Sequence, residues 1–364
     1  MSALNLKLKP IQLDSDDPFK SDLLDRKEEI VNLSLLAQNV DSPAVIAIDS
    51  RWGTGKTTFI KLWEQFLKSK NTHSLYFNAW ETDFSEDPLV SFLGEMSEGL
   101  KSLIGASEET SEAWEKTKAA GKQLAKRVIP ALIRIGTAGV IDADKIIEDE
   151  MVRAAGSLAG DALDNYLQQK AAIAEFHSAL TTFIDNSSSE EQLIIFVDEL
   201  DRCRPTYAIE LLERIKHLFN IEGLVFVLAL DKEQLGHSIK AVYGSGIDSD
   251  GYLRRFIDFE YQLKKPDMEN YIKSLFLALQ LDDFFAPRKK YQELRYDQEH
   301  LKNVFLLLTS SLRLSLREIE QFLASINIAI RTANEKEYLF PALLVFLILS
   351  KHFKPDAYKR YIST

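Results

Sequence analysis

Short, continuous apolar runs alternate along this chain with segments in which apolar residues recur every three or four positions. Apolar runs of this length, bounded by turn residues, predict strands that are buried on both faces of a parallel sheet. The sequence predicts five of them, over residues 44–48, 74–78, 192–197, 224–230 and 257–262.

Helical periodicity fills the intervals between these runs. The predicted helices span residues 22–40, 57–68, 88–103, 176–184, 207–219 and 232–243. Strands that alternate with helices in this way predict an α/β fold, a three-layer αβα core with a mostly parallel sheet and helices on both faces. Beyond Pro266 the periodicity is helical only, and the most apolar segment, 339–353, is expected to pack inside that region.

These patterns divide the chain into a leader (1–20), a core (21–265) and an all-helical C-terminal lid (266–364). Within the core, residues 107–172 are rich in Ala, Lys, Glu and Gly and predict a helical insertion. The most apolar part of that insertion, 128–141, is too short for a bilayer and contains Pro130 and Arg134. We therefore expect a buried or interfacial helix there and no integral membrane span.

The overall charge narrows the range of partners. A net charge of −11 argues against a broad nucleic-acid surface, which normally carries a basic balance. The single cysteine, Cys203, allows no intrachain disulfide, which fits a reducing, cytoplasmic location. It also has no nearby ligand pattern that would make it a metal site.

A phosphate-binding loop follows the first predicted strand. Residues 50–57 match the pattern G-x-x-x-x-G-K-[ST] between a strand and a helix, except that Ser50 replaces the first glycine. Backbone N–H groups and the helix N-terminus would hold phosphates, and the Lys56 ammonium would contact the β- and γ-phosphate oxygens. The Thr57 hydroxyl would ligate Mg²⁺. The residues expected to bind nucleotide are Trp52, Gly53, Thr54, Gly55, Lys56, Thr57 and Thr58.

The substitution at Ser50 matters for the backbone. A serine is small enough for the turn, but a positive φ would cost it more than glycine. Ser50 is therefore the position at which nucleotide affinity would be reduced.

Two carboxylates end the strand at 192–197. Asp198 is expected to hold Mg²⁺, and Glu199 to act as the catalytic base that polarises the attacking water. Phosphoryl transfer depends chiefly on positioning and charge, so these two groups and Lys56 would carry most of the chemistry.

The chain resembles the KAP family of P-loop NTPases. The resemblance lies in a W-G-x-G-K-[ST] element, an F-N-A-W segment, an extended acidic motif with the helix after it, a later apolar strand and a Y-L-x-[KR]-F-I element. These are residues 51–57, 77–80, 198–216, 225–231 and 252–257.

The resemblance implies an ATPase with a lid that works in an oligomer. Family members are often linked to plasmids, phage exclusion or bacterial defence, which implies a regulatory or sensing ATPase with a protein partner or effector in trans. Many relatives carry membrane-spanning helices between the two nucleotide motifs. The charged, Ala-rich segment 107–172 does not support that feature here.

Further candidates have two readings each. Asp231 is a γ-phosphate sensor or a helix cap. Arg254 or Arg255 is an arginine finger, catalytic in a neighbouring subunit, or forms a surface salt bridge. Arg317 is a catalytic sensor of the lid or pairs with a glutamate on its own helix.

The remaining assignments concern supporting residues. Asp201 and Arg202 would support Glu199 or contact a neighbouring subunit, and Trp80 is predicted to be a core residue. By positional analogy with related ATPases, residues 22–26 would lie near the adenine.

ATP binding and hydrolysis with Mg²⁺ in a homo-oligomer is the leading functional prediction. A nucleotide-gated scaffold with little turnover is the rival, and a DNA-motor ATPase is disfavoured by the acidic charge. No N-K-x-D-like guanine-reading element is present, which favours ATP over GTP.

Overall fold

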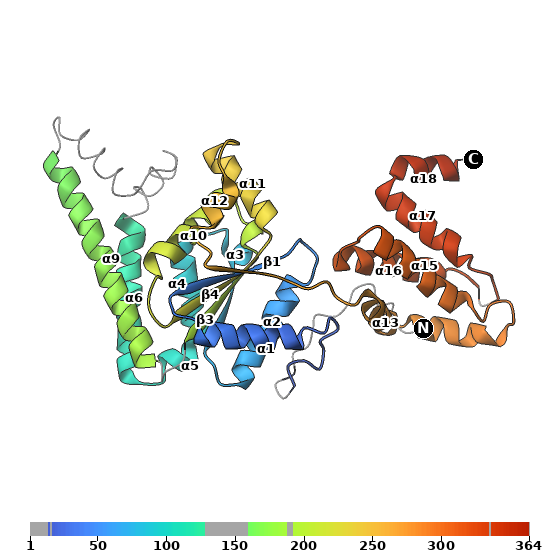
Figure 1. The fold of residues 1–364 in the computed structure, drawn as a ribbon, viewed down its shortest axis with the longest axis horizontal. Helices are drawn as coiled ribbons and strands as arrows, with labels where there is room; N and C mark the ends of the chain where they lie inside the picture. The colour runs from blue at the N-terminus through green and yellow to red at the C-terminus, as the bar shows by residue number, and fades with distance from the viewer. Residues whose placement is uncertain (1–13, 15–16, 128–158, 188–191, 335, 364) are drawn as a thin grey trace. The chain divides into compact units, whose positions relative to one another are not determined.

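The computed structural model describes residue 14 and residues 17–127, 159–187, 192–334 and 336–363 (Figure 1). The chain divides into two compact units. The first, here called the sheet unit, contains residues 29–51 and 56–263. The second, here called the helical unit, contains residues up to 28, the four residues 52–55, and residues 264–364.

The sheet unit is built on five parallel strands in the order β2-β3-β4-β1-β5. Their bounds are β1 Ala44–Asp49, β2 Ser74–Asn78, β3 Leu193–Asp198, β4 Leu224–Leu230 and β5 Phe259–Gln262. The five predicted strands are confirmed, although the last begins two residues later than expected. β1 and β3 are not neighbours, because β4 lies between them and pairs with both.

Helices connect these strands. They are α1 Lys27–Asn39, α2 Lys56–Ser69, α3 Ala79–Thr82, α4 Pro88–Gly99, α5 Lys101–Ile104, α6 Glu108–Arg127, α9 Ala159–Ser187, the 3₁₀ turn η1 Leu200–Arg202, α10 Pro205–Leu218, α11 Lys232–Tyr243 and α12 Ser249–Leu253.

Aromatic contacts show that helices cover both faces of the sheet. On one face, Trp63 of α2 packs edge-on against Phe196 of β3, with ring centroids 5.1 Å apart. On the other, Phe92 of α4 meets Phe77 of β2 at 5.1 Å and Phe226 of β4 at 6.1 Å. Alternate side chains of a strand point to opposite faces, so these contacts define three layers. The predicted αβα core is confirmed.

The described part of the insertion extends the same core. Helices α6 and α9 run side by side (Figure 1), and Trp114 of α6 packs on Phe183 of α9 with centroids 4.9 Å apart. Both side chains belong to the core cluster that includes α4 and α10. Residues 128–158, including the predicted helix at 128–141, and most of the leader lie outside the described residues.

The helical unit contains α13 Met268–Ala278, α14 Leu281–Phe285, the 3₁₀ turn η2 Ala286–Lys290, α15 Asp297–Ser311, α16 Leu316–Ile330, α17 Pro341–Phe353 and α18 Pro355–Ile362. It has its own core, around Phe305 and Leu323. The prediction that α17 packs inside is only half right. Val345 and Leu349 are buried, but Leu343 and Phe346 are 53% and 44% exposed.

Several helix limits differ from the predictions. The first helix begins at Lys27 rather than at residue 22. The expected helix 88–103 is two helices, because α4 ends at Gly99 and α5 begins at Lys101. The expected loop 244–251 already contains the start of α12, whose N-terminus is capped by the Asp248 carboxylate. Among the described residues, none of the helices combines the length and the apolar composition that a bilayer span requires.

Truncation of Phe92 will test the aromatic core of the sheet unit. Phe92→Ala is expected to lower the free energy of unfolding by ~3–5 kcal/mol, because the ring is fully buried among Phe77, Phe219 and Phe226. Phe84→Ala is the control, since that side chain is 87% exposed and its loss should cost less than ~0.5 kcal/mol. Urea denaturation monitored by circular dichroism measures both, and equal effects would contradict this packing.

Candidate nucleotide-binding site

The carboxyl ends of the strands bring polar side chains to one edge of the sheet. Parallel pairing aligns Asn78 at the end of β2 with Asp198 at the end of β3. It also aligns Asp49, at the end of β1, with Leu230 of β4, and Asp231 follows directly. Ligands of open parallel sheets bind at this edge. The predicted metal ligand therefore lies where the fold places ligands.

The loop between β1 and α2 contains two glycines with a left-handed backbone, as the predicted phosphate loop requires. Gly53 and Gly55 have φ values of +76° and +91°, in the region that side chains rarely adopt. Ser50 is not among the residues with positive φ. The expected conformational cost of serine at the first loop position therefore does not arise, and its backbone N–H bonds Leu230 O at 3.1 Å.

Lys56 is the first residue of α2 and is buried. Its ammonium donates a hydrogen bond to the carbonyl oxygen of Ser50. Burial lowers the pKa of Lys56, and surrounding carboxylates oppose that shift. The aspartates responsible, in decreasing order of effect, are Asp201, Asp231, Asp198 and Asp49. A cation is thus held at a helix N-terminus, where anions bind.

The other loop residues stay accessible. Trp52 is 45% exposed, and Thr54, Thr57 and Thr58 are half-buried. The Thr57 and Thr58 hydroxyls make no side-chain hydrogen bond to any described residue. Thr57 therefore offers a free oxygen in the first turn of α2.

Asp198 is 1% exposed, and each of its carboxylate oxygens accepts one hydrogen bond. Oδ1 accepts from the Glu199 backbone N–H at 2.9 Å, and Oδ2 accepts from the Tyr76 hydroxyl at 3.0 Å. Burial and this carboxylate raise the pKa of Tyr76, so the tyrosine stays a proton donor. These bonds fix the orientation of the buried carboxylate.

Glu199 has a left-handed backbone, with φ 60° and ψ 23°. A non-glycine residue in this region is strained, and such strain collects at functional sites. Burial raises the pKa of Glu199. Arg202 opposes that shift through an ion pair of 2.7 Å, and Asn78 opposes it through a side-chain hydrogen bond.

Arg202 links Glu199 to Trp80. Its guanidinium carbon lies 5.7 Å from the centroid of the Trp80 ring. The prediction that Trp80 is a core residue is wrong, because the side chain is 53% exposed. The predicted support of Glu199 by Arg202 is confirmed by the ion pair.

Three residues of this edge were not predicted to take part in the site: Asp49, Tyr76 and Asn78. Burial raises the pKa of Asp49, whose carboxylate accepts the backbone N–H of Lys232 at 3.0 Å. A polar residue at or near the end of a buried strand was the available signal. Asp231 caps α11 by accepting from the Gln234 N–H at 3.3 Å, so the cap reading of this residue is confirmed.

Arg254 and Arg255 follow α12 and are exposed. Neither guanidinium makes an ion pair or hydrogen bond with a residue that the structure describes. The short helix before them is anchored, because the Glu213 carboxylate of α10 accepts the hydroxyls of Tyr243 and Tyr252, each at 3.2 Å. The two arginines are thus free cations on a fixed support.

Arg317 is the second residue of α16, in the helical unit. Ser315 and Glu318 form a capping box that fixes the start of this helix. The Arg317 side chain is exposed, and the alternative pairing with a glutamate on its helix is not found among the described residues. Within the same unit, its backbone N–H donates to Gly53 O at 3.4 Å.

Residues 22–26 also belong to the helical unit, in which Leu24 lies close to Gly55. A Cβ added at Gly55 would meet Leu24 Cδ1 at 3.0 Å. The Arg26 guanidinium is buried and donates to Lys264 O at 2.7 Å.

The donor set suits a magnesium ion bound together with phosphates. Among the described residues, no cluster of three or more His, Cys, Asp or Glu side chains forms a metal site. Mg²⁺ instead commonly takes one or two protein oxygens and completes its shell with phosphate and water. The Thr57 hydroxyl and the Asp198 carboxylate are oxygens of the type that would fill this role.

The parallel sheet, the glycine loop with its lysine, and the acidic strand end define a nucleotide-binding P-loop NTPase. Residues 26–333 match the KAP family P-loop domain, and the chain belongs to this family.

Two further proteins are similar to the chain. The phage T7 exclusion protein of Escherichia coli (strain K12) is 22% identical over 258 residues, which cover 66% of this chain and 32% of that protein. The chain therefore spans about a third of that relative. The Aeropyrum pernix ORC2 protein, solved as ADPNP-ADP complexes, is 13% identical with a TM-score of 0.42, over 91% of this chain and 69% of that one.

Backbone strain at Glu199 predicts an unusual order of stability. Glu199→Gly should be more stable to urea than Glu199→Ala by ~1 kcal/mol, because both lose the carboxylate and only alanine keeps a Cβ at positive φ. Ordinarily glycine is the less stable of the two. If the alanine variant proves equally stable, residue 199 does not hold this conformation in solution.

Proposed function

We propose that this chain binds ATP with Mg²⁺ and hydrolyses it. The observation that carries the proposal is a buried lysine at the N-terminus of α2 that lies in the field of four aspartates, among them Asp198 at the end of β3. A structural salt-bridge network alone would not require the positive-φ glycine loop.

Each residue has a proposed role. Trp52 to Thr58 hold the phosphates, with Lys56 on the β- and γ-phosphate oxygens. Thr57 and Asp198 hold the metal ion, which when bound neutralises phosphate charge and orients the γ-phosphate. Glu199 accepts a proton from the attacking water, once its carboxylate leaves the ion pair with Arg202.

The proposed assembly is a homo-oligomer in which Arg254 or Arg255 completes the site of the neighbouring subunit. The two exposed guanidinium groups, on a support anchored by Glu213, favour this reading. Arg317, on α16 of the helical unit, is proposed as the sensor arginine of the lid.

The biological role is proposed from the family and from one relative. The phage T7 exclusion protein supports a regulatory ATPase in a bacterial defence system, with its effector in trans. The rival proposal, a scaffold that binds ATP with little turnover, is favoured by one observation. The Glu199 carboxylate is already engaged by Arg202 and Asn78.

Phosphate release from Mg·ATP tests the catalytic assignments. Lys56→Ala is expected to lose nucleotide binding. Glu199→Gln should bind ATP but hydrolyse it at least ~10²-fold more slowly than the wild type, because it lacks the proton acceptor. Lys68→Ala is the control, since this exposed lysine lies at the far end of the same helix.

The assay also separates the two proposals for the site. Wild-type turnover that rises with protein concentration supports an assembled ATPase. Wild-type binding with phosphate release no faster than that of Glu199→Gln, at every concentration, would establish the scaffold and refute the catalytic role of Glu199.

Mixing defective subunits tests the proposed trans arginine. Glu199→Gln lacks the base, and Arg254→Ala or Arg255→Ala lacks the finger. An equal mixture should recover up to roughly one quarter of the wild-type rate, because a site is intact when its own subunit keeps Glu199 and its neighbour keeps the arginine.

A matched mixture serves as the control for this rescue. Lys56→Ala and Glu199→Gln both damage the subunit's own site, so their mixture should stay inactive. Absence of rescue with both arginine variants would show that neither residue acts across an interface.

A further inference from the structure

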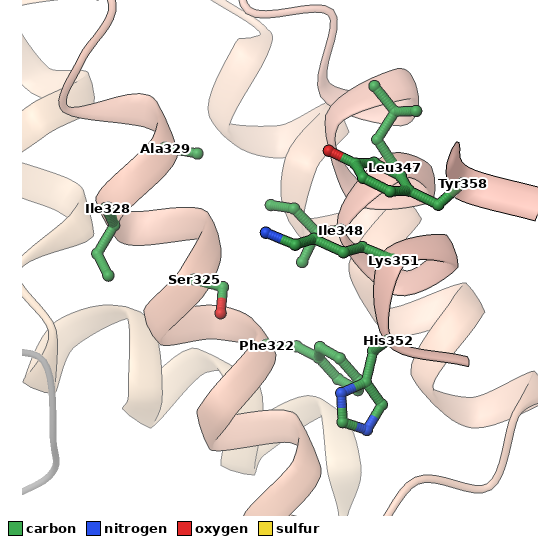
Figure 2. A pocket seen from close by; sticks show the side chains of 9 residues that line it. All are labelled: Phe322, Ser325, Ile328, Ala329, Leu347, Ile348, Lys351, His352 and Tyr358. Atoms are coloured by element: carbon green, nitrogen blue, oxygen red, sulfur yellow. The ribbon is translucent and has the colours of Figure 1, made fainter. Parts of the chain in front are cut away.

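The helical unit contains a cavity, open to solvent on one side, that the proposed nucleotide site does not use. It has a volume of about 530 Å³ and lies among α16, α17 and α18 (Figure 2). Small-molecule sites commonly have volumes of this order, with apolar walls and a few converging polar groups. The chemistry of the lining residues therefore indicates which class of ligand would fit.

Apolar side chains form much of the wall. Phe322 of α16 is buried, and Ile348 of α17 faces it across the cavity. His352 packs its ring edge-to-face on Phe322, with centroids 5.0 Å apart and an interplanar angle of 88°. The aromatic pair lines this end of the cavity and offers an apolar surface to a hydrocarbon or an aromatic body.

Polar groups meet over this apolar surface. Figure 2 shows the Lys351 ammonium and the Ser325 hydroxyl directed into the space between α16 and α17, with the Tyr358 hydroxyl at its edge. Neither Lys351 Nζ nor the Tyr358 hydroxyl has a hydrogen bond or an ion pair with a described residue. Ser325 donates to Gln321 O at 2.9 Å, so its oxygen can still accept. Two donors are left for a ligand.

The charge around the cavity has one dominant sign. None of its lining residues is acidic. Residues 341–362 carry Lys351, Lys354, Lys359 and Arg360 against the single acid Asp356, in a chain whose net charge is −11. A free ammonium beside an apolar wall favours an anion whose charge is joined to an apolar body.

We propose that this cavity binds a small amphipathic anion, a carboxylate or phosphate monoester on a hydrocarbon or aromatic body. Lys351 and Tyr358 bind the charged head, and Phe322 and Ile348 contact the apolar body. The site is independent of the proposed nucleotide chemistry.

Calorimetric titration of the full chain tests the site with defined probes. Octanoate and octyl phosphate are expected to bind saturably, one per chain. The neutral probe 1-octanol and inorganic phosphate alone should each bind at least roughly tenfold more weakly than octanoate. Octanol lacks the anionic head, and inorganic phosphate lacks the apolar body. Equal binding of octanol and octanoate would overturn the role of the cation.

Two matched variants locate the binding. Lys351→Gln should weaken octanoate binding roughly tenfold, while Lys354→Gln, which removes a nearby exposed lysine outside the cavity, should leave it unchanged. Ala329→Phe fills the cavity and should abolish binding of octanoate and octyl phosphate. Equal losses in the two lysine variants would show that general surface charge is responsible.

Vesicles separate a soluble ligand from a lipid surface. In co-sedimentation with vesicles of anionic phosphatidylglycerol, the wild-type protein and Lys351→Gln should bind to the same extent. Vesicle binding without saturable binding of free octanoate would overturn the proposal and assign the basic surface to membranes instead.

Discussion

One ammonium group, that of Lys56, is held in the field of four aspartates at the carboxyl edge of a buried sheet. Burying a charge costs free energy unless an opposite charge lies nearby, so the lysine and the carboxylates offset each other's desolvation cost. The strand order makes the arrangement possible. Because β4 lies between β1 and β3, Asp231 directly after β4 comes between the phosphate loop after β1 and Asp198 at the end of β3. The remaining contacts of the edge, including the hydrogen bond from Tyr76 to Asp198, fix the orientation of the side chains around this lysine.

The strands could be predicted well from the sequence because of how they are buried. β3 and β4 are covered on both faces along their whole length, and such strands appear as unbroken apolar runs. Helix limits were less predictable. Caps decide where a helix begins, and the capping Asp248 lies within a segment that reads as a glycine-rich loop.

The candidate site was predictable wherever a local pattern specifies chemistry. The glycine loop, Lys56 and the Asp198–Glu199 pair are contiguous in the sequence and have recognisable spacing. Asp49, Tyr76 and Asn78 were missed because strand register, and not sequence distance, brings them to this edge. Trp80 was misassigned because aromatic character alone does not reveal that the side chain lies half exposed beside the Arg202 guanidinium.

The exposure of the tryptophans has a spectroscopic consequence. The chain has four, of which Trp63 and Trp114 are buried in the core and should emit at short wavelength, as indoles do in apolar surroundings. Trp52 belongs to the phosphate loop, and Trp80 contacts the arginine that pairs with Glu199. Because Trp52 and Trp80 are exposed, their emission should be red-shifted from that of the two buried tryptophans. The long-wavelength emission therefore reports on changes at the proposed nucleotide site without an added label.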